Sequence, residues 1–229
     1  MSFQFPAAGL AFLRELASNN NKDWFHANKA RYEHDLKLPA RELCAAINGE
    51  LSRIAPSHVS DPAKAINRIN RDIRFSKDKS PYNTKVWAGF TDHSRGKGNS
   101  AGFYFGFGVD GDGSATSCGV GAGLWMPDPP RLEKLRAHFA KHHARYRAVA
   151  DDNDYAAHFD GGQSPRYKRV PKPYEADHPA ADLLTLKGIH ISTELDAALI
   201  TSAELVPTIG RYFGKLAPLV ALLDEALAA

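Results

Sequence analysis

The residues best suited to chemistry gather in one stretch of the chain, between Lys64 and Lys85. This stretch holds seven basic and two acidic residues, a local excess of +5, whereas the whole 229-residue chain carries +3. The remaining residues therefore sum to about −2 by difference, so the positive charge is concentrated here. The candidate ligand-binding residues are Arg68, Arg71, Asp72, Arg74, Lys77, Asp78, Lys79, Tyr82 and Lys85.

This concentration of arginine and lysine predicts an anionic ligand. A guanidinium group offers planar, paired donors that fit phosphate or carboxylate, and an ammonium group adds a mobile charge. Each aspartate either orients a neighbouring arginine or serves as a general base or metal ligand. Tyr82 and Trp87 offer rings for stacking. We expect a small molecule such as a phosphate-bearing metabolite or nucleotide, while the catalytic residues and the cofactor remain unknown.

The charged residues need a strand and a loop to hold them. Apolar and polar residues alternate from Ile69 to Phe75, and this period of two predicts a β-strand. The segment from Ser76 to Asn83 is rich in turn-forming residues and includes Pro81, which removes one backbone donor. A loop held by a rigid strand is a common place for functional residues. The plainer alternative is a solvated edge strand whose lysines discourage pairing with other chains.

Two other kinds of function fit the same residues. A nucleic-acid-binding protein would use this stretch together with a second basic and aromatic segment, from Tyr167 to Tyr174. Such binding weakens steeply with salt. A structural or protein-interaction module would instead form a buried salt-bridge network from the arginines and aspartates. In that case the loss of Arg74 would leave a partner charge uncompensated and lower stability strongly.

Three segments of the chain carry the motifs of a known family. They read NNNKDWFHANKARYE, RDIRFSKDKSPYNTK and GAGLWMPDP. These segments are similar to those of the DUF2461 family of bacterial and fungal proteins, and the resemblance runs over nearly the whole chain. The resemblance implies no particular activity, cofactor or catalytic residue. The functional expectations therefore rest on the residues themselves.

The periodicity of the chain predicts a single α+β domain over residues 1–229, with helices at both ends and a central antiparallel sheet. Apolar residues recur every three or four positions before Ile54 and again after Leu205, and Pro218 is expected to divide the last helical region. Between Lys85 and Leu124 the period is two, with a hairpin turn at residues 110–113. A further strand is expected over residues 187–193.

Glycines alternate with apolar residues in two of the predicted strands, at positions 102–108 and 119–123. Glycine inside a strand usually marks close approach by a ligand or by another backbone. We consider two interpretations of this glycine face. In the first, a helix packs against it. In the second, the glycines form the floor of a ligand groove whose wall consists of Arg68, Asp72 and Arg74.

Several short motifs fit a site poorly. The sequence GFGVDG at residues 106–111 matches a dinucleotide fingerprint, but a hairpin follows it where that fingerprint needs a helix. The DGDG turn has Gly121 where a calcium loop needs glutamate. His138 and His142 lie one helical turn apart, but the segment HFAKH lacks the glutamate of a zinc hydrolase. No metal site is therefore expected.

Composition places the chain among ordinary globular proteins. Cys44 and Cys118 are its only cysteines, which predicts buried, inert thiols in a reducing compartment. The first residues lack the features of a signal peptide, and no apolar run approaches the roughly 20 residues that cross a bilayer. We expect a cytoplasmic protein without a membrane partner, and the sequence does not predict an oligomeric state.

Overall fold

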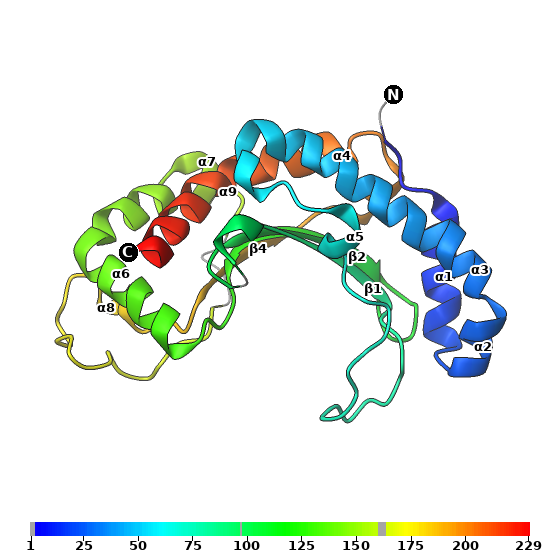
Figure 1. The fold of residues 1–229 in the computed structure, drawn as a ribbon, viewed down its shortest axis with the longest axis horizontal. Coiled ribbons are helices and arrows are strands. Elements are labelled where there is room, and N and C mark those ends of the chain that lie inside the picture. Colours follow the sequence, from blue (N-terminus) through cyan, green and yellow to red (C-terminus); the bar gives the residue numbers. More distant parts are fainter. Residues whose placement is uncertain (1–2, 97, 160–163) are drawn as a thin grey trace.

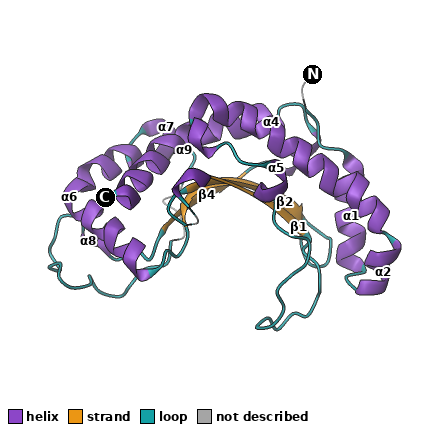
Figure 2. Cartoon of the chain, viewed as in Figure 1, coloured by secondary structure: helices purple, strands orange, loops and turns teal. Residues whose placement is uncertain are grey.

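The computed structural model describes residues 3–96, 98–159 and 164–229 and confirms the predicted α+β class (Figure 1). Four antiparallel strands form a sheet in chain order, with β1 and β4 at its edges. The strands are β1 (Lys85–Thr91), β2 (Gly102–Val109), β3 (Thr116–Leu124) and β4 (Ile189–Glu194). The sheet is arched, and the described helices lie over its convex side or beside it, which leaves its concave face open (Figure 2).

Along the chain, helices precede β1, lie between β3 and β4, and follow β4. Those before β1 are α1 (Ala7–Ser18), α2 (Lys22–Ala27), α3 (Lys29–Arg31), a π-helical segment (Tyr32–Lys37), α4 (Leu38–Ile54) and α5 (Pro62–Ala65). The later ones are α6 (Pro129–Ala150), α7 (Asn153–Ala156), α8 (Ala181–Leu184) and α9 (Leu205–Ala228). Short 3-10 helices cover Pro56–His58, His93–Arg95 and Ala197–Thr201. None of the described helices is long and apolar enough to cross a membrane.

Side chains at the helix ends explain where the helices begin. The carboxamide of Asn21 accepts a hydrogen bond from the backbone N–H of Trp24 at 2.9 Å, so it caps α2 as its sequence position predicts. The carboxylate of Asp128 accepts from the N–H of Arg131 at 3.1 Å and caps α6 in the same way. Both caps satisfy backbone donors that have no partner inside the helix.

The core lies between the convex face of the sheet and the helices above it. Phe103, Phe105 and Phe107 of β2 are at most 2% exposed. Phe213 of α9 packs on Phe103 with ring centroids 4.9 Å apart, and Phe5 meets Phe107 edge to face at 4.6 Å. Burying one such side chain stabilises the fold by about 1.5–3 kcal/mol. The aromatic side of β2 therefore anchors both the first and the last helical segments.

Helix α9 runs without interruption through Pro218, so the expected division into two helices is wrong. A proline inside a helix removes one backbone hydrogen bond and crowds the carbonyl four residues earlier, here that of Gly214. Phe213 and Leu223, on either side of the proline, are both fully buried. Packing along the whole helix outweighs the local cost, because tertiary contacts supply most of a helix's stability in a protein.

The glycines lie on the concave face, where the backbones of neighbouring strands come unusually close. A Cβ atom added to Gly121 would lie 2.4 Å from the carbonyl oxygen of Ile191, and one added to Gly123 would lie 2.0 Å from that of Ile189. Gly123 also has a φ of 140°, which side-chain-bearing residues rarely adopt. The nearest atoms to the glycines of β2 and β3 belong to the neighbouring strands and their flanking residues and not to a helix, so the interpretation that a helix packs on the glycines is wrong.

This crowding predicts a large difference between two glycines of the same face. Gly121→Ala should destabilise the protein by about 1–3 kcal/mol, the usual cost of overpacking, because the clash is with backbone. Gly89→Ala is the matched control, since its Cβ would meet only the Tyr104 ring, at an ordinary 3.7 Å. Urea unfolding of the two variants measures the difference. Equal stability of both variants would show that the backbone of β4 does not restrict position 121 as the structure implies.

Candidate functional site

Residues 67–84, which carry most of the predicted ligand-binding set, form a loop that extends from the β1 edge of the sheet (Figure 1). The predicted strand over residues 69–75 is wrong, because only isolated bridges such as Asn70–Tyr82 occur there. The side chains of Asp72 and Asp78 accept hydrogen bonds from backbone N–H groups two residues later, which turns the chain locally. Phe75 is 95% exposed, so this segment has no buried face to support a strand.

The charged side chains of this loop bind mainly to the loop itself. Arg74 donates to both carboxylate oxygens of Asp72, and Arg71 donates to Asp78 and to the carbonyl of Ser80. The Arg74 and Asp72 side chains remain 76% and 60% exposed. Exposed pairs contribute little to stability, because water already solvates both charges well. These salt bridges therefore lie at the protein surface. They do not form the buried salt-bridge network that a structural or protein-interaction module would require.

Other members of the predicted set lie in different environments. Lys79 donates to the carbonyl of Ile73 at 3.0 Å. Tyr82 is 4% exposed and stacks on Phe25 with centroids 4.1 Å apart, so its ring belongs to the core. A hydrogen bond from Arg74 and, more weakly, the charge of Arg68 lower the pKa of Asp72. Within the described residues, Lys77 has no side-chain hydrogen bond or ion pair.

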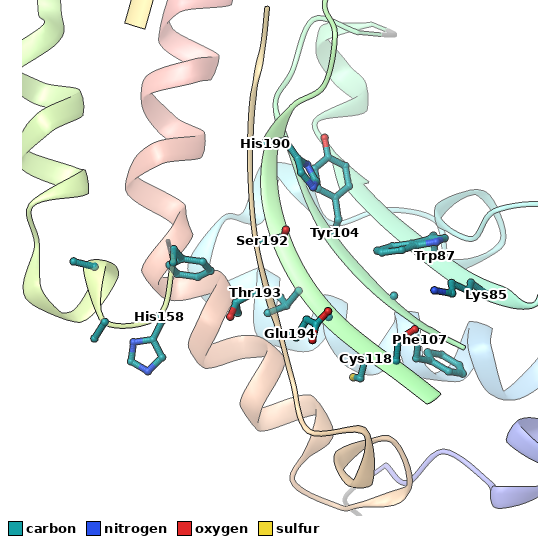
Figure 3. A pocket seen from close by; sticks show the side chains of 18 residues that line it. Lys85, Trp87, Tyr104, Phe107, Cys118, His158, His190, Ser192, Thr193 and Glu194 are labelled. Carbon is teal, nitrogen blue, oxygen red and sulfur yellow. The ribbon is translucent and has the colours of Figure 1, made fainter. Parts of the chain in front are cut away.

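Lys85, a member of the predicted set, lines a cavity on the concave face of the sheet. Two hollows of about 560 and 840 Å³ adjoin there. They share Trp87, Tyr104, His190 and Ser192, which come from β1, β2 and β4, and Figure 3 shows Trp87, Tyr104 and His190 projecting from their strands. We call the two hollows together the concave groove. Each has the size of a typical small-molecule site.

Trp87, Tyr104 and Trp125 give the concave groove an aromatic lining. The ring of Trp87 lies against Gly106, where an added Cβ would be 2.2 Å from a ring carbon, and the side chain stays 49% exposed. The hydroxyl of Tyr104 donates to the carbonyl of Gly123 at 2.8 Å, and burial raises the pKa of Tyr104 to about 12. Trp125 is 55% exposed. The glycine floor therefore lets flat rings lie close to the sheet.

His190 is the titratable side chain at the centre of the concave groove. Its ring lies 5.7 Å from that of Tyr104 and meets that of Trp125 edge to face at 5.5 Å. Partial burial lowers the pKa of His190, so the imidazole is neutral near pH 7. Its Nδ1 is buried and has no hydrogen-bond partner among the described residues. These residues can be identified from the sequence, because polar side chains recur at every second position of this short strand, at His190, Ser192 and Glu194.

The residues that the sequence predicts as the wall of the groove lie elsewhere in the structure. Arg68, Asp72 and Arg74 belong to the projecting loop and do not line either hollow. The side chains that line it beside the aromatic ones include Lys64, Asn67 and Glu194. The glycines do form the floor of the groove, as the second interpretation required, but residues other than the predicted ones form its wall.

Ser100, His58 and Asp224 form a buried polar cluster beneath α9. The hydroxyl of Ser100 and the carboxylate of Asp224 both contact the same ring nitrogen of His58, Nε2, at 3.4 and 3.3 Å. A catalytic triad needs its serine and its acid on opposite ring nitrogens. Asp224 also accepts the backbone N–H of Ala101 at 2.7 Å. This cluster therefore ties α9 to the sheet rather than activating the serine.

The two cysteines are buried and unpaired, as the sequence predicts. Burial raises the pKa of each thiol, Cys44 and Cys118, to about 12. Because the thiolate is the nucleophile, neither sulfur is activated at neutral pH.

The surroundings of Arg74 and Tyr82 predict opposite effects of mutation within the same stretch. Arg74→Ala should leave the melting temperature unchanged within error, because its ion pair with Asp72 is exposed. Tyr82→Ala should destabilise the fold by about 3–5 kcal/mol, the range for removing a buried aromatic side chain. Thermal unfolding of both variants checks this. A large loss with Arg74→Ala would restore the structural interpretation of the arginines.

The comparisons with known proteins concern the chain as a whole. No curated protein and no solved structure matches it. A family model described as "Conserved hypothetical protein (DUF2461)" matches residues 8–221, which is nearly the full length. The chain therefore belongs to the DUF2461 family.

Proposed function

We propose that the protein binds an anionic small molecule with a planar ring in the concave groove. The observation that carries this proposal is the half-exposed ring of Trp87, which lies on a glycine floor where the two hollows meet. Lys85 lines one of these hollows and Lys64 lines the other. An aromatic surface next to two ammonium groups suits a ring that carries a phosphate or a carboxylate.

Stacking supplies much of the binding free energy in this proposal. A flat heterocycle on an aromatic side chain gains about 1–3 kcal/mol, by analogy with bases on protein rings. The hydrogen bond from Tyr104 to Gly123 holds its ring in place, so little side-chain freedom is lost on binding. His190, neutral near pH 7, adds a polar group that donates to or accepts from the ligand.

Charge in the groove orients the ligand. Lys85 is 3.4 Å from the carboxylate of Asp110, but both side chains are substantially exposed, so the pair leaves the ammonium free to turn towards an anion. Glu194 lines the same hollow and repels negative charge. The anionic group therefore sits near Lys85 and away from Glu194. The reduced, buried cysteines agree with the cytoplasmic setting expected from the sequence.

A thermal-shift screen against nucleotides, sugar phosphates and aromatic organic acids tests the site. A ligand at 100 times its Kd should stabilise the protein by about 2.7 kcal/mol, because it binds only the native state. Trp87→Ala and Lys85→Ala should each abolish the shift. Phe75→Ala is the matched control, since this exposed aromatic residue lies on the loop outside the groove. A shift that survives Trp87→Ala but disappears with Arg74→Ala would place the site on the loop.

A second candidate function is binding of single-stranded nucleic acid across the concave face. The basic stretch that ends at Lys85 leads into β1, and a segment that includes Lys168, Arg169 and Lys172 precedes β4. These two strands form opposite edges of the sheet. Basic segments that lead into both edge strands of a face with exposed aromatic rings suit a single strand, which binds to such a combination without sequence preference.

Salt dependence distinguishes this second function from the first. If the two edges contact phosphates, the affinity for an oligonucleotide should fall with salt by a logarithmic slope of about 0.7 for each phosphate neutralised. Lys168→Ala together with Lys172→Ala should reduce the slope, whereas Lys22→Ala, on α2 away from the sheet, should not. Fluorescence anisotropy with a labelled oligonucleotide measures both. A slope near zero would exclude this function.

A further inference from the structure

A second cluster of titratable side chains lies away from the concave groove, where α6 packs on α9. His138 and His142 of α6 and Glu225 of α9 each offer one ligand atom, and these atoms all lie within 4.8 Å of one another. The two imidazole rings are 4.5 Å apart between centroids. Glu225 lies far from both histidines in the sequence, and only the packing of the two helices brings it to them.

The proton on His138 can be assigned from its neighbours. The hydroxyl of Tyr146 lies 3.2 Å from the carbonyl of Leu222, which only accepts, so the tyrosine proton goes there. The Nδ1 of His138 lies 2.8 Å from the same hydroxyl oxygen, so Nδ1 carries a proton and donates it to Tyr146. In the neutral ring, Nε2 is then left with a lone pair. Metal-binding histidines are held in this way, with the other ring nitrogen donating to a fixed acceptor.

The free nitrogen of His138 faces a carboxylate at the separation of two metal ligands. Its Nε2 is 3.3 Å from Oε1 of Glu225. Two ligands at about 2.0–2.1 Å from a tetrahedral zinc ion are about 3.3 Å apart, so this pair already spans one edge of the tetrahedron. His138 is 6% exposed, which holds its ring rigidly in the helix interface.

His142 supplies the third ligand from a break in helix α6. Its backbone has φ −122° and ψ 21°, values outside the helical range, within an otherwise continuous helix. A shift of the partly exposed His142 ring by roughly 1.5 Å would bring a nitrogen to the tetrahedral distance from the other two ligands.

We propose that His138, His142 and Glu225 bind one divalent transition-metal ion, with zinc as the best fit, and that this ion clamps α6 to the end of α9. Two imidazoles and one carboxylate form a known zinc ligand set, and water fills the remaining position. The site lacks a glutamate between the two histidines, so nothing in the cluster is placed to activate that water as a peptidase does. The ion therefore has a structural role.

Arg145 limits the affinity of this site. Its guanidinium donates to both oxygens of Glu225, at 2.7 and 2.8 Å, and so competes with the ion for Oε1. A metal on Oε1 leaves Oε2 for Arg145, which then becomes a supporting partner but still repels the cation. Removing Arg145 should consequently tighten metal binding, although it breaks an ion pair of the protein. If the cluster joins the two helices without binding a metal, removing Arg145 should not tighten metal binding.

The test is a zinc titration of the untagged full chain after removal of metal with a chelator. Calorimetry should give one zinc ion per chain, and cobalt at the same site should show visible absorption bands. His142→Ala and Glu225→Gln should each weaken zinc binding by at least about tenfold, since removal of a mere hydrogen-bond partner of a metal ligand already causes that loss. Arg145→Ala should tighten it. Zinc should also raise the melting temperature of the wild-type protein, because it joins two helices.

His143→Ala is the matched control, because His143 neighbours the cluster on the same helix without belonging to it. Its zinc affinity should equal that of the wild type. The proposal fails if the wild-type protein binds zinc no more tightly than His142→Ala and Glu225→Gln do, which includes the case of no binding. It also fails if a stoichiometric zinc ion is retained in both variants, since the ion would then sit elsewhere.

Discussion

The close approach of β3 and β4 on the concave side of the sheet is the constraint on which the rest of the structure depends. The space that a side chain at Gly121 or Gly123 would fill is taken by carbonyl oxygens of the neighbouring strand. Only glycine permits this approach, and the sheet that contains it is arched (Figure 1). The arch in turn defines a convex face that carries the core and a concave face that stays open.

The two faces divide the aromatic residues between two tasks. Phe103, Phe105 and Phe107 point to the convex side, where α1 and α9 bury them. Trp87 and Tyr104 point to the concave side, where glycines on neighbouring strands leave room for their rings. Rings of the first group contribute stability through burial, whereas those of the second remain partly exposed and line the concave groove.

In the charged loop, arginines pair with aspartates of the same loop. Asp72 and Asp78 hold the arginines that a ligand would need, and they do so at the surface, where the interaction costs little desolvation. Lys85 differs because it begins β1, and the strand places it in the groove. Similarly, Asp224 and Glu225 are adjacent in α9 but belong to different clusters, one with His58 and one with His138.

The sequence by itself determined the fold class, the three strands between Lys85 and Leu124 and the strand near residue 190, because these depend on local periodicity. It also determined the helix caps at Asn21 and Asp128, because a cap depends on a short-range hydrogen bond. It also identified the family through long contiguous motifs. Tertiary structure alone decided that residues 69–75 are a loop, that α9 passes through Pro218, and that the concave groove gathers Trp87, Tyr104 and His190 from three strands. Those outcomes depend on packing between segments distant in the chain, and no local pattern of residue types encodes which distant neighbour a side chain will meet.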